Sequence, residues 1–209
     1  MTIIFSNAMD RDCAIIPTMW SGLNPERMVE IRPGMHDWED EVDSAISSED
    51  EVLILVGHGT ERGLLSPTLN GTYVVHQNNV RRIKSKKVVC CWCYAAEFCH
   101  SYNLHAFATS MFISNTREAI DNSIYGYSQE LIDSTAMRFY QEINHLLKNN
   151  VALEELVMRL GAHMDIENAV DTFNRQGICY IENVETETSE RVNFNEKATN
   201  DAELADNFK

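Results

Sequence analysis

The chain has 209 residues, of which 44 % are hydrophobic, 9 are glycine and 4 are proline. This composition is typical of one globular domain with a sizeable core, and it excludes collagen and low-complexity chains. The formal net charge of −15 repels phosphate backbones, so we expect no nucleic-acid partner. No apolar stretch reaches the ~18 residues of a membrane helix, and the first ten residues lack the features of a signal peptide, so we expect a cytoplasmic protein without a membrane partner.

Six short apolar runs predict β-strands, because each is rich in β-branched or bulky residues and is bounded by polar or turn-forming residues. They lie at residues 1–7, 28–32, 52–56, 88–93, 106–113 and 177–181. The run at 52–56 is unbroken, which suits a strand covered on both faces, as in a parallel sheet. The polar stretch after the first run, up to about Glu26, is predicted to be a loop.

Apolar residues recur at helical spacing in the segments between these runs. The predicted helices cover about residues 37–46, 94–102, 131–147 and 153–173, the last interrupted at Gly161. Strands that alternate with helices imply right-handed crossovers, so the predicted fold class is α/β, with a mainly parallel sheet between helices on both faces. Residues 1–183 form the predicted domain, and residues 184–209, with 7 acidic and 3 basic side chains, form a predicted mobile tail.

Two of the predicted strands end in reactive side chains. The run at 52–56 leads to His58, and the run that begins at Val88 leads to Cys93. Because the carboxyl ends of adjacent parallel strands lie at one edge of a sheet, we expect imidazole and thiol to meet there. An ordinary thiol, with a pKa of ~8.5, is only a few per cent thiolate at neutral pH, so a nearby imidazole makes it a nucleophile. Gly59 allows close approach of a substrate carbonyl, and its N–H and that of Cys93 are candidate oxyanion donors.

Two segments resemble the caspase-like cysteine peptidases of clan CD, which include caspases, legumain, clostripain, gingipains, separase and the CHAT-domain proteases. Residues 53–65 carry an apolar strand, a His-Gly pair and a later Gly-Leu-Leu strand, and residues 84–93 carry a basic lead-in, a strand and a cysteine. The resemblance implies a three-layer caspase-like fold with a six-stranded sheet in residues 1–183. It also implies a cysteine endopeptidase that works through a His58/Cys93 dyad and a thioester acyl-enzyme, without metal or organic cofactor.

The same resemblance locates the nucleophile and the specificity pocket. Counting from the basic lead-in selects Cys93 rather than Cys91. The residues expected to border the primary specificity pocket are Cys91, Trp92, Ser114, Asn115 and Thr116. Cys91-Trp92-Cys93 replaces the Gln-Ala-Cys of caspases and the Asp-Ala-Cys of clostripain-like members, so no preferred substrate residue is implied. The acidic charge favours a basic protein or peptide substrate, and the oligomeric state stays open.

Other interpretations of these residues remain open. A catalytically silent caspase-like module that binds a protein or peptide also agrees with the bulky Trp92 and the missing specificity residue. Cys90 and Cys93 form a Cys-x-x-Cys pair, and with Cys99 and His100 nearby the segment has soft ligands for zinc. Alternation along a strand, however, sends Cys90 and Cys93 to opposite faces. A thioredoxin-like redox pair is disfavoured, because such pairs begin a helix and this one ends a strand.

Overall fold

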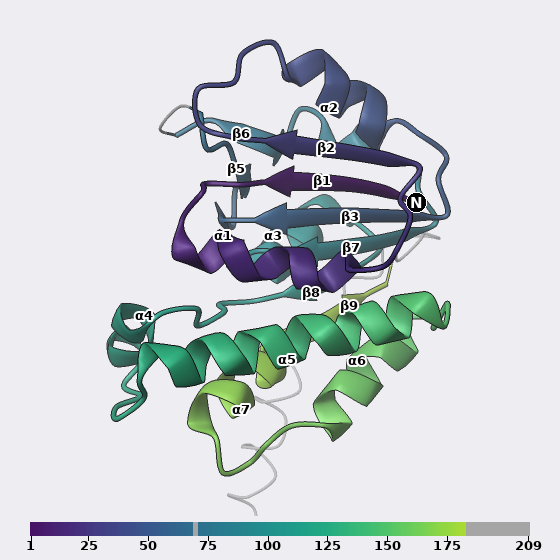
Figure 1. Cartoon of the computed structure of the whole chain (residues 1–209). Helices are drawn as coiled ribbons and strands as arrows, with labels where there is room; N and C mark the ends of the chain where they lie inside the picture. The colour runs from purple at the N-terminus through teal and green to yellow at the C-terminus, as the bar shows by residue number, and fades with distance from the viewer. Residues whose placement is uncertain (69–70, 183–209) are drawn as a thin grey trace, which may run out of the picture.

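The computed structural model describes residues 1–68 and 71–182, and within them a six-stranded sheet runs through the molecule (Figure 1). Its strands, in the order in which they lie, are β2 (Arg27–Ile31), β1 (Thr2–Ser6), β3 (Val52–Gly57), β7 (Lys87–Cys91), β8 (Ala106–Thr109) and β9 (Ile178–Ile181). The first five are parallel to their neighbours, and β9 pairs antiparallel with β8. The predicted α/β class with a mainly parallel sheet is confirmed.

Helices cover both faces of this sheet. They are α1 (Arg11–Ile15), α2 (Glu39–Ile46), α3 (Ala95–Tyr102), α4 (Thr116–Asp121), α5 (Gln129–Lys148), α6 (Leu153–Ala162) and α7 (Ala169–Gln176), with the 3-10 turns η1 (Ile16–Trp20) and η2 (Val80–Arg82). Buried residues of α2 and α3 pack on one face, and those of α1, η1, α5 and α6 pack on the other. Because side chains alternate along β7, Cys90 enters the first core and Cys91 the second.

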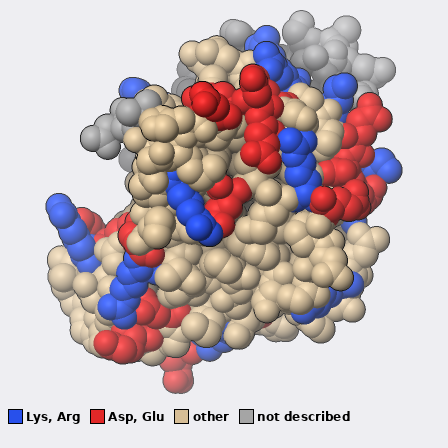
Figure 2. All heavy atoms as spheres, turned by 45° about the horizontal axis from the view of Figure 1, so that its top comes forward, with Lys and Arg blue, Asp and Glu red and all other residues tan. Residues whose placement is uncertain are grey.

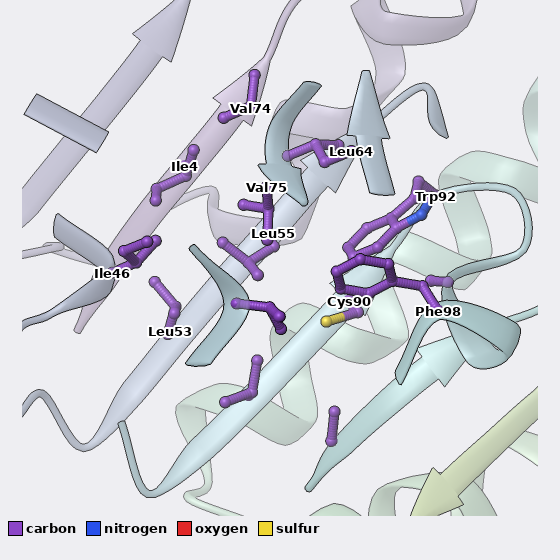
Figure 3. Packing of buried hydrophobic residues seen from close by; sticks show 14 of the residues in the cluster. Ile4, Ile46, Leu53, Leu55, Leu64, Val74, Val75, Cys90, Trp92 and Phe98 are labelled. Carbon is purple, nitrogen blue, oxygen red and sulfur yellow. The ribbon is translucent and has the colours of Figure 1, made fainter. Parts of the chain in front are cut away.

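A small antiparallel sheet extends the first of these two cores. It consists of β4 (Gly59–Thr60), β5 (Gly63–Leu65) and β6 (Tyr73–His76), all between β3 and β7 in sequence. Leu64 of β5 and Val75 of β6 pack in the same cluster as Leu55 of β3 (Figure 3). The small sheet therefore begins directly after β3, at the residues that the sequence marks as a candidate site.

Strands β7 and β8 end earlier than expected. β7 ends at Cys91 and β8 at Thr109. The Thr109 hydroxyl donates to the Trp92 carbonyl at 2.8 Å, and the Tyr94 amide donates to the Ser110 carbonyl at 3.2 Å. These hydrogen bonds replace the regular ladder and turn the chain out of the sheet after Cys91.

Two predictions for the connecting segments are wrong. The expected loop after β1 contains α1 and η1, because Asp10 caps α1 by accepting a hydrogen bond from the Cys13 amide at 2.9 Å. A helix of five residues is too short to show a helical period in the sequence. The interruption expected at Gly161 comes later, because Gly161 lies inside α6 and the break between α6 and α7 is the segment 163–168, in which Ile166 is 80 % exposed. The predicted tail, 184–209, lies outside the described residues.

An ionic network fixes α7 against α5 and α6. The guanidinium of Arg175 donates to Asp171 at 2.9 Å, to Glu142 of α5 at 2.7 Å and to the Leu160 carbonyl of α6 at 2.7 Å. The side chains of Arg175 and Asp171 are 0 % and 1 % exposed, so water cannot replace either partner. Removing Arg175 would leave the buried Asp171 with the longer ion pair to Arg138 at 3.4 Å, and removing Asp171 would leave Arg175 with Glu142, so either change breaks a buried ion pair and is destabilising.

Surface charge is mixed in sign on the face that Figure 2 shows, where Lys and Arg lie beside Asp and Glu. Some of the chain's charged side chains form surface ion pairs, such as Lys86 with Glu51 at 3.0 Å. Pairs of this kind contribute little to stability. The net charge of −15 is therefore not gathered into one acidic patch on this face. Across residues 1–68 and 71–182, no helix has both the length and the apolar character required to cross a membrane.

Candidate active site

His58 and Cys93 lie at the same edge of the sheet. Strands β3 and β7 are parallel neighbours, with Val56 opposite Cys91 in the register. His58 and Cys93 each follow this pair by two residues, so they leave the sheet at the same level. Both side chains line one cavity of about 30 Å³, which has room for one or two water molecules. The structure thus brings together the two residues that the sequence singled out.

His58 is held by a carboxylate that the sequence analysis missed. Its Nε2 lies 2.6 Å from Oδ2 of Asp10, which follows β1, the other parallel neighbour of β3. Burial raises the pKa of Asp10, but the hydrogen bond from the Cys13 amide and the interaction with His58 outweigh it and hold this pKa below its ordinary value. The carboxylate is ionised and can only accept, so Nε2 carries a proton, and in the neutral form of the imidazole the lone pair is then on Nδ1.

Cys93 hydrogen bonds away from His58. Its thiol donates to the carbonyl oxygen of Phe112, with 3.6 Å between Sγ and oxygen. Burial and the negative charges of Glu118 and Asp12 raise the pKa of Cys93 to about 11. At neutral pH this thiol is protonated, and the arrangement is a resting one in which the two side chains share a cavity but each has another partner.

The backbone around Cys93 is strained. Cys93 lies between the end of β7 and the start of α3, and Tyr94, which follows it, has a φ of +67°. The left-handed conformation costs about 1–3 kcal/mol for a residue other than glycine. The exposed side chain at this turn is that of Tyr94, and Cys93 directly before it is partly buried, whereas in the nucleophile elbows of hydrolases the nucleophile itself is at the tip. Strain of this kind is typical of functional sites.

Both glycines that flank His58 are required by packing. A Cβ on Gly57, whose φ is +147°, would lie 2.5 Å from the backbone oxygen of Ser6. A Cβ on Gly59 would lie 1.9 Å from Cδ1 of Trp92. The indole N–H of Trp92 donates to the Thr60 carbonyl at 3.1 Å. The indole therefore fills the side of Gly59 on which a Cβ would lie, so a substrate carbonyl could approach the Gly59 N–H from another side only.

Trp92 lines the cavity and is also part of the core. It is buried and packs edge to face against Phe98 of α3, with 5.6 Å between ring centroids (Figure 3). Its ring belongs to the cluster that also contains Leu64 and Cys90. Trp92 thereby fixes β4 and the turn that carries Cys93 relative to each other.

Only some of the residues expected to border the specificity pocket line the cavity in the described part of the structure. Cys91, Trp92 and Ser114 line the cavity that His58 and Cys93 share. Asn115 instead caps α4 and donates from Nδ2 to Asp12 at 3.0 Å, and the Thr116 amide donates to Gln129. Asp12 itself lines the cavity. The acidic pair of Asp10 and Asp12 after the first strand is the sequence signal that could have revealed both residues.

The four clustered cysteines are split between the two cores. Cys90 of β7 and Cys99 of α3 lie in the core between the sheet and α3. Cys91 and Cys93 face the opposite core. The alternation expected from the sequence is confirmed, and Cys90 and Cys93 do not face a common site.

At this edge a carboxylate orients an imidazole, and a thiol sits on a strained turn beside it. The arrangement has the parts of a nucleophilic site, namely a nucleophile, a base and a group that orients the base. No family model matches this chain, and no curated protein or solved structure matches it significantly.

Proposed function

We propose that this protein is a cysteine endopeptidase in which Cys93 attacks the peptide carbonyl, His58 transfers the proton and Asp10 orients His58. The observation that carries the proposal is the Asp10–His58 pair, 2.6 Å apart, beside Cys93 at the ends of two register-matched strands. The resemblance of residues 53–65 and 84–93 to clan CD peptidases supports the same assignment. A mainly parallel six-stranded sheet with helices on both faces also agrees with a caspase-like fold.

The proposed acylation begins when Cys93 rotates from the Phe112 carbonyl toward Nδ1 of His58. The thiol proton passes to Nδ1, and the sulfur forms a bond to the substrate carbonyl carbon. The C–N bond then breaks, and the same proton leaves with the amine. The imidazolium that forms transiently is stabilised by the Asp10 carboxylate at Nε2.

Deacylation uses the same groups in the reverse direction. His58 takes a proton from water, which adds to the thioester carbonyl, and the C–S bond breaks. The carboxylic acid leaves, and the proton returns to the Cys93 sulfur. The N–H groups of Gly59 and Cys93 are the proposed donors to the oxyanion in both steps, and each such donor is typically worth ~3 kcal/mol.

The charges around the thiol favour a basic substrate side chain. Asp12 lines the cavity, and both Asp12 and Glu118 act electrostatically on Cys93. Opposite charge at the pocket would stabilise lysine or arginine before the scissile bond. The present volume, about 30 Å³, is too small for either side chain, so substrate binding must widen the cavity.

A digest of a peptide library tests the proposal. Wild-type protein should cleave a subset of peptides, whereas Cys93→Ala and His58→Ala should not. Cys179→Ala is a matched control, because Cys179 is also partly buried and its thiol pKa is likewise raised to about 11. Loss of cleavage in the control, or survival of cleavage in Cys93→Ala, would contradict the proposal.

The second candidate function is a catalytically silent module that binds a protein or peptide. The small cavity and the protonated Cys93 favour this candidate. It predicts that the wild type cleaves no peptide in the library and that Cys93→Ala binds the same partner with unchanged affinity. The digest and a binding measurement on the same two proteins separate the candidates.

A further inference from the structure

We propose that Asp10, Cys13 and His58 form a binding site for one zinc ion. One ligand atom from each of the three lies within 4.8 Å of the other two. A carboxylate, a thiol and an imidazole are ligand types that Zn²⁺ accepts, and the sulfur disfavours Mg²⁺ and Ca²⁺. This cluster shares no residue with the Cys-x-x-Cys pair that the sequence suggested.

Backbone geometry holds the three residues together. Asp10 and Cys13 lie on either side of the first turn of α1, where Oδ1 of Asp10 accepts from the Cys13 amide at 2.9 Å. The second oxygen, Oδ2, is then directed to His58. β1 and β3 are parallel neighbours with Ser6 opposite Gly57, so the start of α1 and the residue after β3 leave the sheet together.

The distances fit a tetrahedral ion after small movements. Zinc binds sulfur at ~2.3 Å and nitrogen or oxygen at ~2.0–2.2 Å, so its ligand atoms lie roughly 3.3–3.7 Å apart. The Asp10–His58 pair must open from 2.6 Å, and the remaining separations, at most 4.8 Å, must close slightly. The Cys13 sulfur would give up a long contact of 3.9 Å to the Ser6 carbonyl oxygen.

The site also has an entrance and an open position. The Cys13 side chain is buried, whereas those of Asp10 and His58 are 45 % and 39 % exposed. An ion can therefore enter from the side of the carboxylate and the imidazole. Three protein ligands leave the fourth position for water, the pattern of an open zinc site.

Zinc at this position would block the proposed proton transfer, a consequence that rests on the proposed function. Binding releases the Cys13 thiol proton and uses the Nε2 lone pair of His58, so the imidazole proton moves to Nδ1. A protonated Nδ1 cannot receive the Cys93 proton. The ion also binds the Asp10 carboxylate, which then no longer accepts the hydrogen bond from His58. Zinc would therefore act as a reversible inhibitor.

Cobalt(II) titration of the full chain tests the site directly, because thiolate bound to Co²⁺ gives an intense near-ultraviolet charge-transfer band. We expect one equivalent to produce the band and one equivalent of Zn²⁺ to remove it. Cys13→Ser should lose the band, and His58→Ala should weaken binding by at least about 100-fold, the upper effect of losing an outer-shell partner. Cys93→Ala and Cys179→Ser should retain the band.

Several results would overturn the site: no band in the wild type, a band that survives in Cys13→Ser, or a band that is lost in Cys93→Ala. Circular dichroism reports whether Cys13→Ser folds, and if it does not, His58→Ala decides alone, because His58 is partly exposed and outside the core.

Zinc inhibition of peptide cleavage is measured separately, with each protein normalised to its own rate without zinc. Cys13→Ser should resist zinc relative to the wild type, and equal sensitivity would refute the inhibitory role. Binding without any cleavage would leave the metal site standing and reject the peptidase, so the two failures are distinguishable.

Discussion

The reactivity of Cys93 should depend on pH in a way that the structure fixes. Burial and nearby carboxylates raise the pKa of this thiol to about 11. At pH ~7.5 the thiolate fraction is then about 3 in 10,000, compared with roughly one-tenth for an ordinary thiol. Because the thiolate is the reacting species, alkylation by iodoacetamide should be roughly 300-fold slower than that of an exposed cysteine at that pH.

The assay is quenched alkylation followed by peptide mapping, repeated from pH 6 to pH 10.5. The rate at Cys93 should rise about tenfold per pH unit, without a plateau in this range. Cys179 is an internal comparison, because burial raises its pKa to about 11 as well. Asp12→Asn should increase the rate at Cys93 several-fold, since it removes one of the negative charges that oppose the thiolate.

A plateau at Cys93 with a midpoint below pH 7 would refute this reasoning. It would mean that a thiolate–imidazolium pair already exists in the resting protein.

The raised pKa of Cys93 also determines how the free energy of unfolding depends on pH. Because the folded state binds the proton more tightly than the unfolded chain, stability should fall as the pH rises from about 8.5 to about 11.

Three substitutions test other parts of the account. Gly59→Ala places a Cβ 1.9 Å from the indole behind it, so urea unfolding should show a loss of about 1–3 kcal/mol. Arg175→Ala removes the buried guanidinium from Asp171, which keeps the longer ion pair with Arg138 at 3.4 Å, and should cost about 3 kcal/mol in the same assay, the lower end for a broken buried pair; an unchanged midpoint would show that the network is not structural. Asp10→Asn should lower kcat with little change in KM. The decrease in kcat should be smaller than the ~10⁴-fold seen for buried triad aspartates, because the Asp10 side chain is 45 % exposed. An unchanged kcat would show that Asp10 has no role in the mechanism.

The strands could be predicted because their signal is local. Residues 52–56 and 88–91 are continuous apolar runs of strand length, and such runs are typical of strands covered on both faces. Once they are neighbours, parallel pairing alone brings His58 and Cys93 to one edge. That part of the candidate site therefore follows from patterns within short segments.

The partners of these side chains could not be predicted, because they depend on contacts between distant segments. The contact of Asp10 with His58 spans 48 residues and requires the short helix α1, which has no helical period in the sequence. Likewise, the packing of the Trp92 indole against Gly59, which requires a glycine there, joins segments that lie far apart in the sequence. The direction of the Cys93 thiol depends on where the chain after β8 places the Phe112 carbonyl.

Trapping the acyl-enzyme tests the central claim most directly. A cleaved peptide from the library, as its activated ester, is mixed with the protein, quenched in acid and mapped by mass spectrometry. The account predicts a thioester on Cys93 that forms in the wild type and is lost or greatly slowed in His58→Ala. An adduct on Cys91, or no adduct on any cysteine during turnover, would contradict it.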